Sequence, residues 1–139
     1  MKMNVVVDDG CYMPVKAHEW DAGFDLRTPK EFMLYSDGDY EIIDTGVHVE
    51  IPEGYCGFIK SKSGLNIKHD IICEGVVDCG FTGTIVVKLR NIGLRDYKFD
   101  KGDKFCQLVI LPTPKLELEL VKELKETERG ASGFGSTGR

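Results

Sequence analysis

The sequence lacks the features that mark membrane-spanning, secreted and nucleic-acid-binding proteins. No apolar run approaches the ~20 residues of a membrane span, and residues 1–9 do not have the pattern of a signal peptide. A net charge of −5 disfavours general binding to nucleic acid. We therefore expect no membrane partner and no nucleic-acid partner, and a location in the cytoplasm, or in the host cytoplasm if the origin is viral.

The sequence also has no C-x-x-C pair, and its five cysteines are an odd number. This spacing fits neither a disulfide framework nor a zinc site. We expect five reduced thiols that act mostly as small buried apolar groups. They are Cys11, Cys56, Cys73, Cys79 and Cys106.

Alanine, the best helix former, is scarce, whereas the β-branched residues valine and isoleucine are abundant. The chain of 139 residues is long enough for one domain, and its short apolar runs, separated by turns, predict an all-β fold. The expected strands cover residues 4–8, 31–35, 40–44, 48–51, 55–60, 76–77, 84–89, 105–111 and 116–120. The strands at 76–77 and 84–89 are expected to form a hairpin with a broad loop, and residues 63–69 a short helix with Ser63 as its N-cap.

The C-terminal stretch is rich in glycine and has one bulky apolar residue, Phe134. We expect residues 1–125 to form the folded domain and residues 126–139 a flexible arm. Composition alone favours a disordered tail. The alternative is a lid that becomes ordered on an anion, because glycine-rich backbone and the side chains of Arg129, Ser136 and Thr137 supply donors for phosphate oxygens.

Five short segments carry more glycine, aspartate, serine and basic residues than a simple β-sandwich needs. In their order and spacing they resemble the five motifs of the trimeric deoxyuridine triphosphatases, the dUTPases. The first four are Ala22-Gly23-Phe24-Asp25-Leu26, Lys62-Ser63-Gly64-Leu65, the run from Gly75 to Gly83, and Gly102-Asp103-Lys104-Phe105-Cys106-Gln107-Leu108. The fifth is the run from Arg129 to Gly138.

The resemblance implies a jelly-roll β-barrel that forms a homotrimer, with active sites at the subunit interfaces and the C-terminal arm of one chain closing a site elsewhere. It implies a dUTP diphosphatase that hydrolyses dUTP to dUMP and pyrophosphate with Mg²⁺, which limits uracil incorporation into DNA and supplies dUMP for dTMP synthesis. A regulatory protein partner is compatible with such a chain, and the sequence does not identify one.

The resemblance also assigns roles to residues. Asp78 is expected to be the general base that activates water for attack on the α-phosphate; the alternative is an aspartate that satisfies turn amides. Asp25 is expected to support Mg²⁺ through water, together with the substrate phosphates; a structural role at the Gly23 turn is the alternative. The expected substrate-binding residues are Lys62, Ser63, Gly64, Gly75, Val76, Val77, Phe81, Val86, Gln107, Arg129, Phe134, Gly135, Ser136 and Thr137.

Three positions depart from the family's usual residues. Lys62 and Lys104 stand where the family has arginine, so the charge is kept and the planar, bidentate fork is lost. Phe81 stands where the family has tyrosine, so the ring that excludes a 2′-hydroxyl is kept without the phenol group. The three histidines have no metal-binding spacing and are assigned no chemistry.

Two other functions are compatible with this fold. A dCTP deaminase has a similar barrel and acts on the base, but the intact arm and the placing of Asp78 favour the dUTPase. A binding or regulatory module that has lost hydrolysis is the other alternative, and the presence of every expected chemical group argues against it. Incubation with dUTP, dCTP, dTTP and UTP would distinguish the three.

Overall fold

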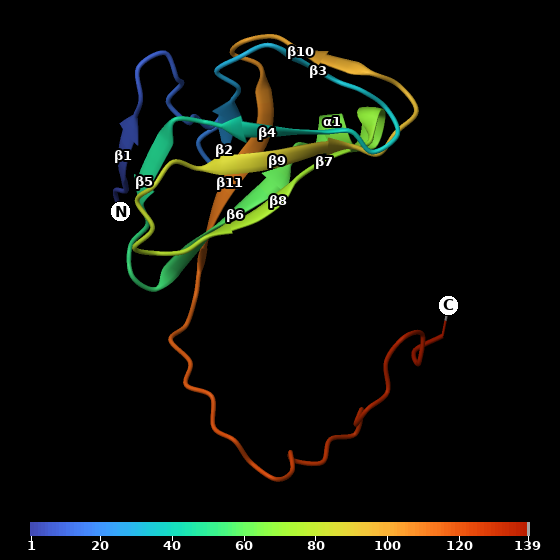
Figure 1. The fold of residues 1–139 in the computed structure, drawn as a ribbon. Helices are drawn as coiled ribbons and strands as arrows, with labels where there is room; N and C mark the ends of the chain where they lie inside the picture. Colours follow the sequence, from blue (N-terminus) through green and yellow to red (C-terminus); the bar gives the residue numbers. More distant parts are fainter. Residues whose placement is uncertain (139) are drawn as a thin grey trace.

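The computed structural model describes residues 1–138, in which eleven strands and one short helix form the fold (Figure 1). No helix among these residues is long and apolar enough to span a membrane. The elements are β1 (Asn4–Val7), β2 (Gly23–Arg27), β3 (Phe32–Leu34), β4 (Tyr40–Asp44), β5 (Val47–Glu50), β6 (Tyr55–Ser61), α1 (Ser63–His69), β7 (Ile71–Ile72), β8 (Glu74–Val77), β9 (Val86–Asn91), β10 (Tyr97–Phe99) and β11 (Lys104–Pro112).

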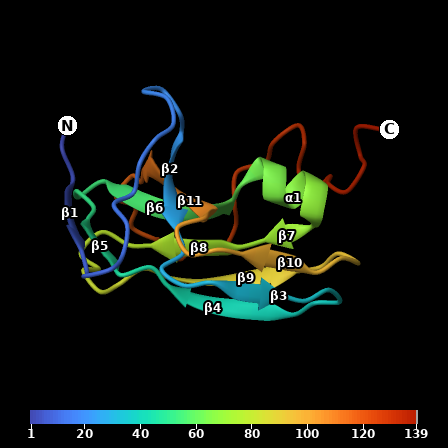
Figure 2. The same ribbon diagram turned by 90° about the horizontal axis from the view of Figure 1, so that it is seen from above.

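All strand pairs are antiparallel. A four-stranded sheet has the order β2-β11-β6-β8 and a three-stranded sheet the order β4-β9-β7. The two-stranded ribbons β1-β5 and β3-β10 complete the body (Figure 2). The expected all-β jelly-roll class with one short helix is confirmed.

Alternation along the strands builds the core. In β9, Val87, Leu89 and Asn91 are buried and the residues between them are exposed, as a strand with one wet face requires. The core also receives Leu26, Leu34, Ile43, Val47, Val49, Ile59, Phe99, Phe105 and Leu108, each at most 2% exposed. Cys73 and Cys106 are buried among them, and all five cysteines are free thiols.

The expected hairpin of residues 76–77 and 84–89 is wrong in its pairing. β8 pairs with β6, through Val77 opposite Gly57, whereas β9 pairs with β4 and β7 in the other sheet. The chain therefore crosses from one sheet to the other through residues 78–85, and the two strands diverge. This divergence opens the space between β8 and β9.

The expected helix is confirmed, but the expected role of Ser63 as its N-cap is wrong. Lys62 occupies the N-cap position with extended backbone and no capping side-chain hydrogen bond, and Ser63 is the first helical residue. The Ser63 hydroxyl is consequently not committed to the backbone of the helix.

The chain leaves the sheets after Pro112. Residues 113–138 hang below the body (orange to red in Figure 1) and have no strand partner within residues 1–138. The expected strand at 116–120 is therefore wrong for a single chain, although its alternation is real: Leu118 and Leu120 are 100% exposed. A strand needs a neighbouring backbone for its hydrogen bonds, and one copy of this chain provides none.

Candidate active site

The loop between β8 and β9 lines a groove of about 300 Å³. Asp78 stands directly after β8, where the chain turns away from the sheet, and its side chain is exposed at the rim. The turn is closed by a 3.3 Å hydrogen bond from the Phe81 amide to the Asp78 carbonyl. The groove joins most of the base-binding and sugar-binding residues expected from the sequence: Gly75, Val76, Val77, Phe81 and Val86.

The Phe81 ring packs against the backbone of Gly83, which has no side chain. A β-carbon built on Gly83 would lie 2.7 Å from Cζ of the Phe81 ring, closer than any side chain can approach. Glycine at 83 is therefore required for the ring to lie in this position. The ring remains 47% exposed, so one side is available to a ligand.

Two polar contacts hold the loop against the β4–β5 corner. Nδ1 of His48 lies 2.8 Å from the Thr82 carbonyl oxygen, and Nε2 of the same ring lies 3.1 Å from Oδ1 of Asp8. The Thr84 hydroxyl donates to Asp44 at 3.3 Å. The histidine spacing assigned His48 no chemistry, and the two partners of its ring are 34 and 40 residues away along the chain.

A second cluster joins β2, β11 and the start of α1. The Asp25 carboxylate accepts a hydrogen bond from Lys62 Nζ at 2.5 Å on one oxygen and from Lys104 Nζ at 2.8 Å on the other. Burial of Asp25 by itself would raise its pKa, but hydrogen bonds from Lys104 and Lys62 and their charges outweigh it, so its pKa lies below the ordinary value. The cluster carries one net positive charge.

Gln107 lies beside this cluster, opposite Asp25 in the β2–β11 ladder. Its side-chain amide donates to the Ser61 carbonyl at 3.1 Å. A β-carbon on Gly23 would lie 2.3 Å from Gln107 Oε1, so the glycine makes room for the amide. Ser63 and Gly64, at the exposed start of α1, complete the cluster.

The two clusters lie at opposite ends of β6. Asp78 follows Val77, which is opposite Gly57 near the start of that strand. Lys62 follows Ser61, its last residue. At ~3.3 Å per strand residue, Asp78 and Lys62 are about 20 Å apart along one chain. A single copy therefore does not bring the expected base together with the expected phosphate-binding residues.

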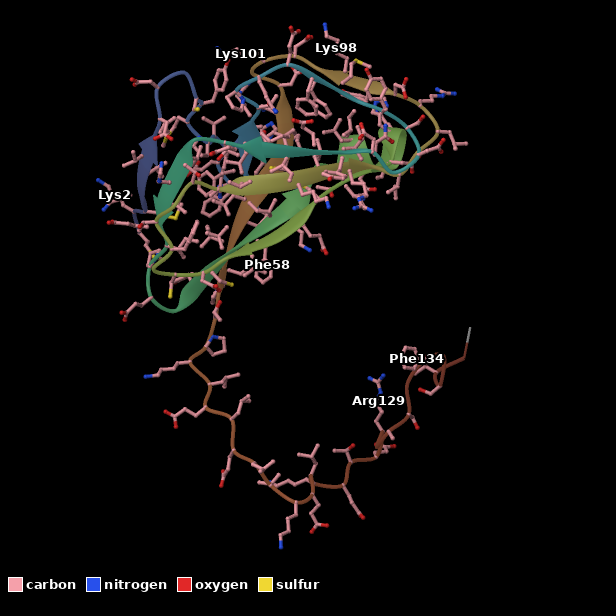
Figure 3. All side chains as sticks on the ribbon, viewed as in Figure 1. Lys2, Phe58, Lys98, Lys101, Arg129 and Phe134 are labelled. Atoms are coloured by element: carbon pink, nitrogen blue, oxygen red, sulfur yellow. The ribbon has the colours of Figure 1, made fainter. Side chains whose placement is uncertain are left out.

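The arm residues of the expected site are separate from both clusters. Arg129 and Phe134 lie on the extended C-terminal segment, away from the sheets (Figure 3). The Phe134 ring is fully exposed, and Gly135, Ser136 and Thr137 follow it in a series of turns. Among residues 1–138, the Arg129 guanidinium donates to the Ser132 carbonyl at 3.0 Å, three residues along the chain.

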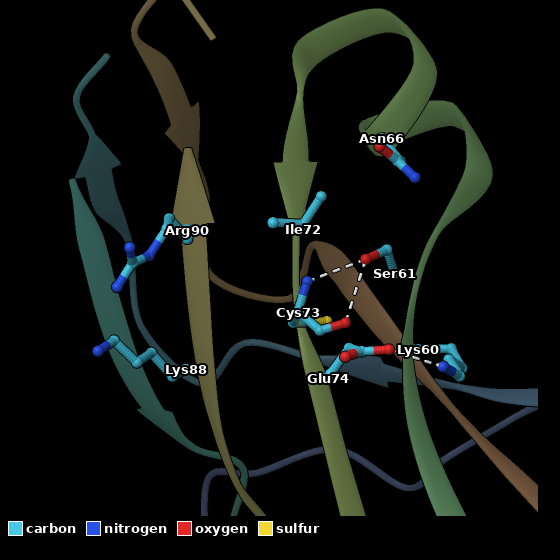
Figure 4. A pocket seen from close by; sticks show the side chains of 8 residues that line it. All are labelled: Lys60, Ser61, Asn66, Ile72, Cys73, Glu74, Lys88 and Arg90. Atoms are coloured by element: carbon cyan, nitrogen blue, oxygen red, sulfur yellow. Dashed lines mark hydrogen bonds and ion pairs between the residues drawn. The ribbon is translucent and has the colours of Figure 1, made fainter. Parts of the chain in front are cut away.

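A larger groove of about 590 Å³ lies between β9 and β7 of the three-stranded sheet and β6 and β8 of the four-stranded sheet (Figure 4). Lys60, Lys88 and Arg90 line it, and Glu74 is the one carboxylate among the lining residues. The Lys60 ammonium pairs with Glu74 at 2.8 Å, and the Lys88 ammonium lies 4.1 Å from the centre of the Tyr40 ring. None of the expected site residues lines this groove.

The described residues fit a metal ion only when other groups contribute ligands. No three His, Cys, Asp or Glu side chains gather into a metal-binding group within residues 1–138. Each oxygen of Asp25 already accepts a hydrogen bond from a lysine, so direct coordination of Mg²⁺ would displace an ammonium. Contact through water, using the remaining lone pairs of the carboxylate, stays a prediction.

The chain is similar to known proteins of one family. The dUTPase family model matches residues 10–138. The deoxyuridine 5'-triphosphate nucleotidohydrolase of Clostridium acetobutylicum is 39% identical over 135 residues, covering 95% of this chain and 92% of the relative. That of Clostridium novyi is 41% identical over 129 residues, covering 91% and 90%.

Two solved structures are also similar. The Staphylococcus bacteriophage 80alpha dUTPase with dUPNHPP has a TM-score of 0.91 and 29% identity, covering 99% of both chains. A mutant dUTPase from phage phi11 of S. aureus, described with a structural Mg(II) ion, has a TM-score of 0.82 and 27% identity, covering 91% of this chain and 100% of that chain.

Proposed function

The chain belongs to the dUTPase family and is a nucleotide hydrolase, and on this premise we propose that it converts dUTP to dUMP and pyrophosphate. The observation that carries the proposal is the groove between the diverging β8 and β9, which has an aspartate at its rim and an aromatic ring across it. By this reaction the enzyme limits uracil incorporation into DNA and supplies dUMP.

Asp78 is the proposed general base. A carboxylate fixed beside the α-phosphate can accept a proton from water and hold that water in line for attack. Its backbone is constrained by the Phe81–Asp78 turn hydrogen bond, and its side chain is exposed and free to contact a bound nucleotide. The alternative, an aspartate that satisfies turn amides, would require a hydrogen bond from one of those amides to the Asp78 carboxylate.

β8 is the proposed reader of uracil. It is the last strand of its sheet, and one of its edges has no ladder partner within residues 1–138. The free N–H and C=O groups of such an edge can pair with the polar edge of a base. Val76, Val77 and Val86 narrow the slot, which would reject the methyl group of thymine, and the Phe81 ring would leave no room for a 2′-hydroxyl.

The Asp25–Lys62–Lys104 cluster, with Ser63 and Gln107, is the proposed phosphate site. A triphosphate carries about four negative charges, so local cations must compensate for the net acidity of the chain. Asp25 keeps both ammonium groups together, and Ser63 can donate to the oxygen that leaves with pyrophosphate. Mg²⁺ would enter with the phosphate oxygens and neutralise part of their charge.

The separation of the two clusters supports active sites that are shared between copies, as in the homotrimer that the family resemblance implies. Because Asp78 and Lys62 lie about 20 Å apart in one chain, a complete site requires the groove of one copy and the phosphate cluster of another. The outer face of β4 exposes Tyr40 and Ile42 at 50% and 55%, as a surface that packs against another copy would.

The C-terminal arm is the proposed lid. Between Thr113 and Arg129 the extended chain can span roughly 50 Å, which is enough to reach a site on a neighbouring copy. There Phe134 would stack on uracil, while Arg129, Ser136, Thr137 and the backbone of Gly135 would bind the γ-phosphate. Ordering the arm costs conformational entropy, so closure should require the full triphosphate.

The test is incubation of the purified protein with dUTP, dCTP, dTTP and UTP in the presence of Mg²⁺, followed by separation of the products. We expect dUMP and pyrophosphate from dUTP and little turnover of the other three. Ammonia released from dCTP would identify a deaminase instead. Binding of dUTP without hydrolysis would identify a binding or regulatory module.

A further inference from the structure

The loop that carries Asp78 and Phe81 is fastened to the body by a histidine that the expected site does not include. His48, on β5, reaches the Thr82 carbonyl oxygen at 2.8 Å with Nδ1 and the Asp8 carboxylate at 3.1 Å with Nε2. Thr82 is the residue next to Phe81. The imidazole therefore connects the end of β1 to the loop across the strand between them.

Both partners of this ring are hydrogen-bond acceptors. A carbonyl oxygen and an ionised carboxylate have no proton to donate, so each contact needs a hydrogen on the facing nitrogen. A neutral imidazole carries one N–H and can make only one of the two bonds, whereas the imidazolium makes both. The geometry thus selects the protonated ring.

The surroundings of His48 also favour the protonated ring. The hydrogen bond to the Thr82 carbonyl is the largest influence; desolvation opposes it, and the carboxylates of Asp8 and Asp44 add to it, so the pKa of His48 lies above its ordinary value of 6.5. His48 and Glu50 both line a second groove beside β1, where Glu50 accepts a hydrogen bond from Asn4. The thiol of Cys11 packs against Gly46 at the same corner.

We propose that His48 is a positioning residue that, when protonated, ties the 78–83 loop to β1 and β5 and so keeps the groove in its binding form. The proposal rests on the proposed function, because it concerns the groove that takes the nucleotide. His48 touches no substrate atom in this arrangement and acts through Thr82. Both hydrogen bonds of the His48 ring exist below its raised pKa, and one of them is lost as the pH rises through that pKa.

The consequence is a pH-dependent affinity. With one tether lost the loop samples more conformations, and the KM for dUTP should rise about three- to fivefold across this pH range, the effect of a single net hydrogen bond. The turnover number at saturation should change less, because bound nucleotide restores the loop. Titration of the substrate phosphates also affects KM, but it does so equally in every variant.

The first experiment measures the loop without using activity. Amide hydrogen exchange of the peptide containing residues 78–83 is compared at one pH near 6 for the native protein, His48→Ala, His48→Gln and the control His18→Ala, whose histidine pairs with Asp21 elsewhere on the surface. We expect exchange to be about three- to fivefold faster than in the native protein for both His48 variants, and the rate to be unchanged in the control. Equal exchange in all four proteins would overturn the proposal, whatever the enzyme does with dUTP.

The second experiment follows KM for dUTP between about pH 5.5 and 8.5. This range extends about one unit below and about two units above the ordinary pKa of histidine. The native protein and His18→Ala should show the rise, and His48→Ala should have the higher KM throughout. Asp8→Asn removes the charge that favours the protonated ring, and its amide can either accept a hydrogen bond from Nε2 or donate one to it, so the rise should move to lower pH and become smaller. A KM profile of His48→Ala that superimposes on the native one would refute the tether.

Discussion

The sharpest consequence of the structure is that two inactive variants should restore each other. Asp78→Asn removes the proposed base, and Ser63→Ala removes the proposed donor to the leaving oxygen at the far end of β6. If Asp78 and Ser63 of one site come from different chains, a mixed trimer can contain sites with both native residues. If they came from one chain, no mixture of the two variants could.

The magnitude follows from random assembly. In a 1:1 mixture, about half of the copies that supply a groove carry native Asp78, and about half of those that supply a phosphate cluster carry native Ser63, so about one quarter of the sites are intact. A general base is worth 10²–10⁴ in rate and an oxyanion-type donor about 10²–10³. The mixture should thus reach about one quarter of native activity, while each parent stays near or below roughly 1%.

The assay is release of pyrophosphate from dUTP after the two variants, carrying different affinity tags, are unfolded together and refolded. Each variant refolded alone is the control. Isolation through both tags shows that mixed assemblies have formed. Mixed assemblies with no more activity than either parent would refute the reasoning from the β6 register.

Three further predictions concern single sites. Deletion of residues 129–139 should leave a folded, dUMP-binding protein whose dUTP turnover falls at least about tenfold because the lid is lost; unchanged turnover would exclude a lid. Phe81→Ala should raise the UTP/dUTP ratio of kcat/KM about tenfold by admitting a 2′-hydroxyl, and an unchanged ratio would discard the ring as a sugar gate. Asp25→Asn leaves two ammonium groups facing each other and should cost about 2–3 kcal/mol in urea unfolding, below the 3–5 of a fully buried pair. Because the folded pKa of Asp25 is depressed, this difference should be complete above the unfolded pKa of about 3.9 and vanish as pH falls through the folded value; a difference that persisted at lower pH would contradict the ion-pair explanation.

Most strands and the helix could be predicted because their signals are local, whereas β2, β7 and β10 were not among the expected strands. Tyr40–Asp44 and the helix Ser63–His69 have the expected bounds. β2 was missed because Asp25 and Arg27 interrupt its apolar pattern. The buried Asp25 carboxylate is compensated by its ion pairs with two lysines, and neither lysine lies within thirty residues of it along the chain.

The resemblance supplied the expected site residues and their sharing between subunits, but not how far apart a single chain holds them. The sequence resemblance identifies Asp78 and Lys62 as partners in one reaction, but only the β6–β8 register shows that they belong to different ends of one sheet. Local alternation predicted a strand at 116–120, and this prediction failed because no backbone within residues 1–138 pairs with that segment. The role of His48 could not be predicted, because it depends on two hydrogen-bond acceptors that only the structure locates.

The fully exposed leucines at 118 and 120 also bear on how this protein is made. An unpaired, alternating apolar segment adheres to other unpaired strands, whether or not they belong to its own kind. In newly synthesised chains, aggregation therefore competes with correct association, and the outcome depends on the concentration of unassembled copies. We expect rapid overproduction to give inclusion bodies, and slower synthesis in the same cells to give soluble enzyme.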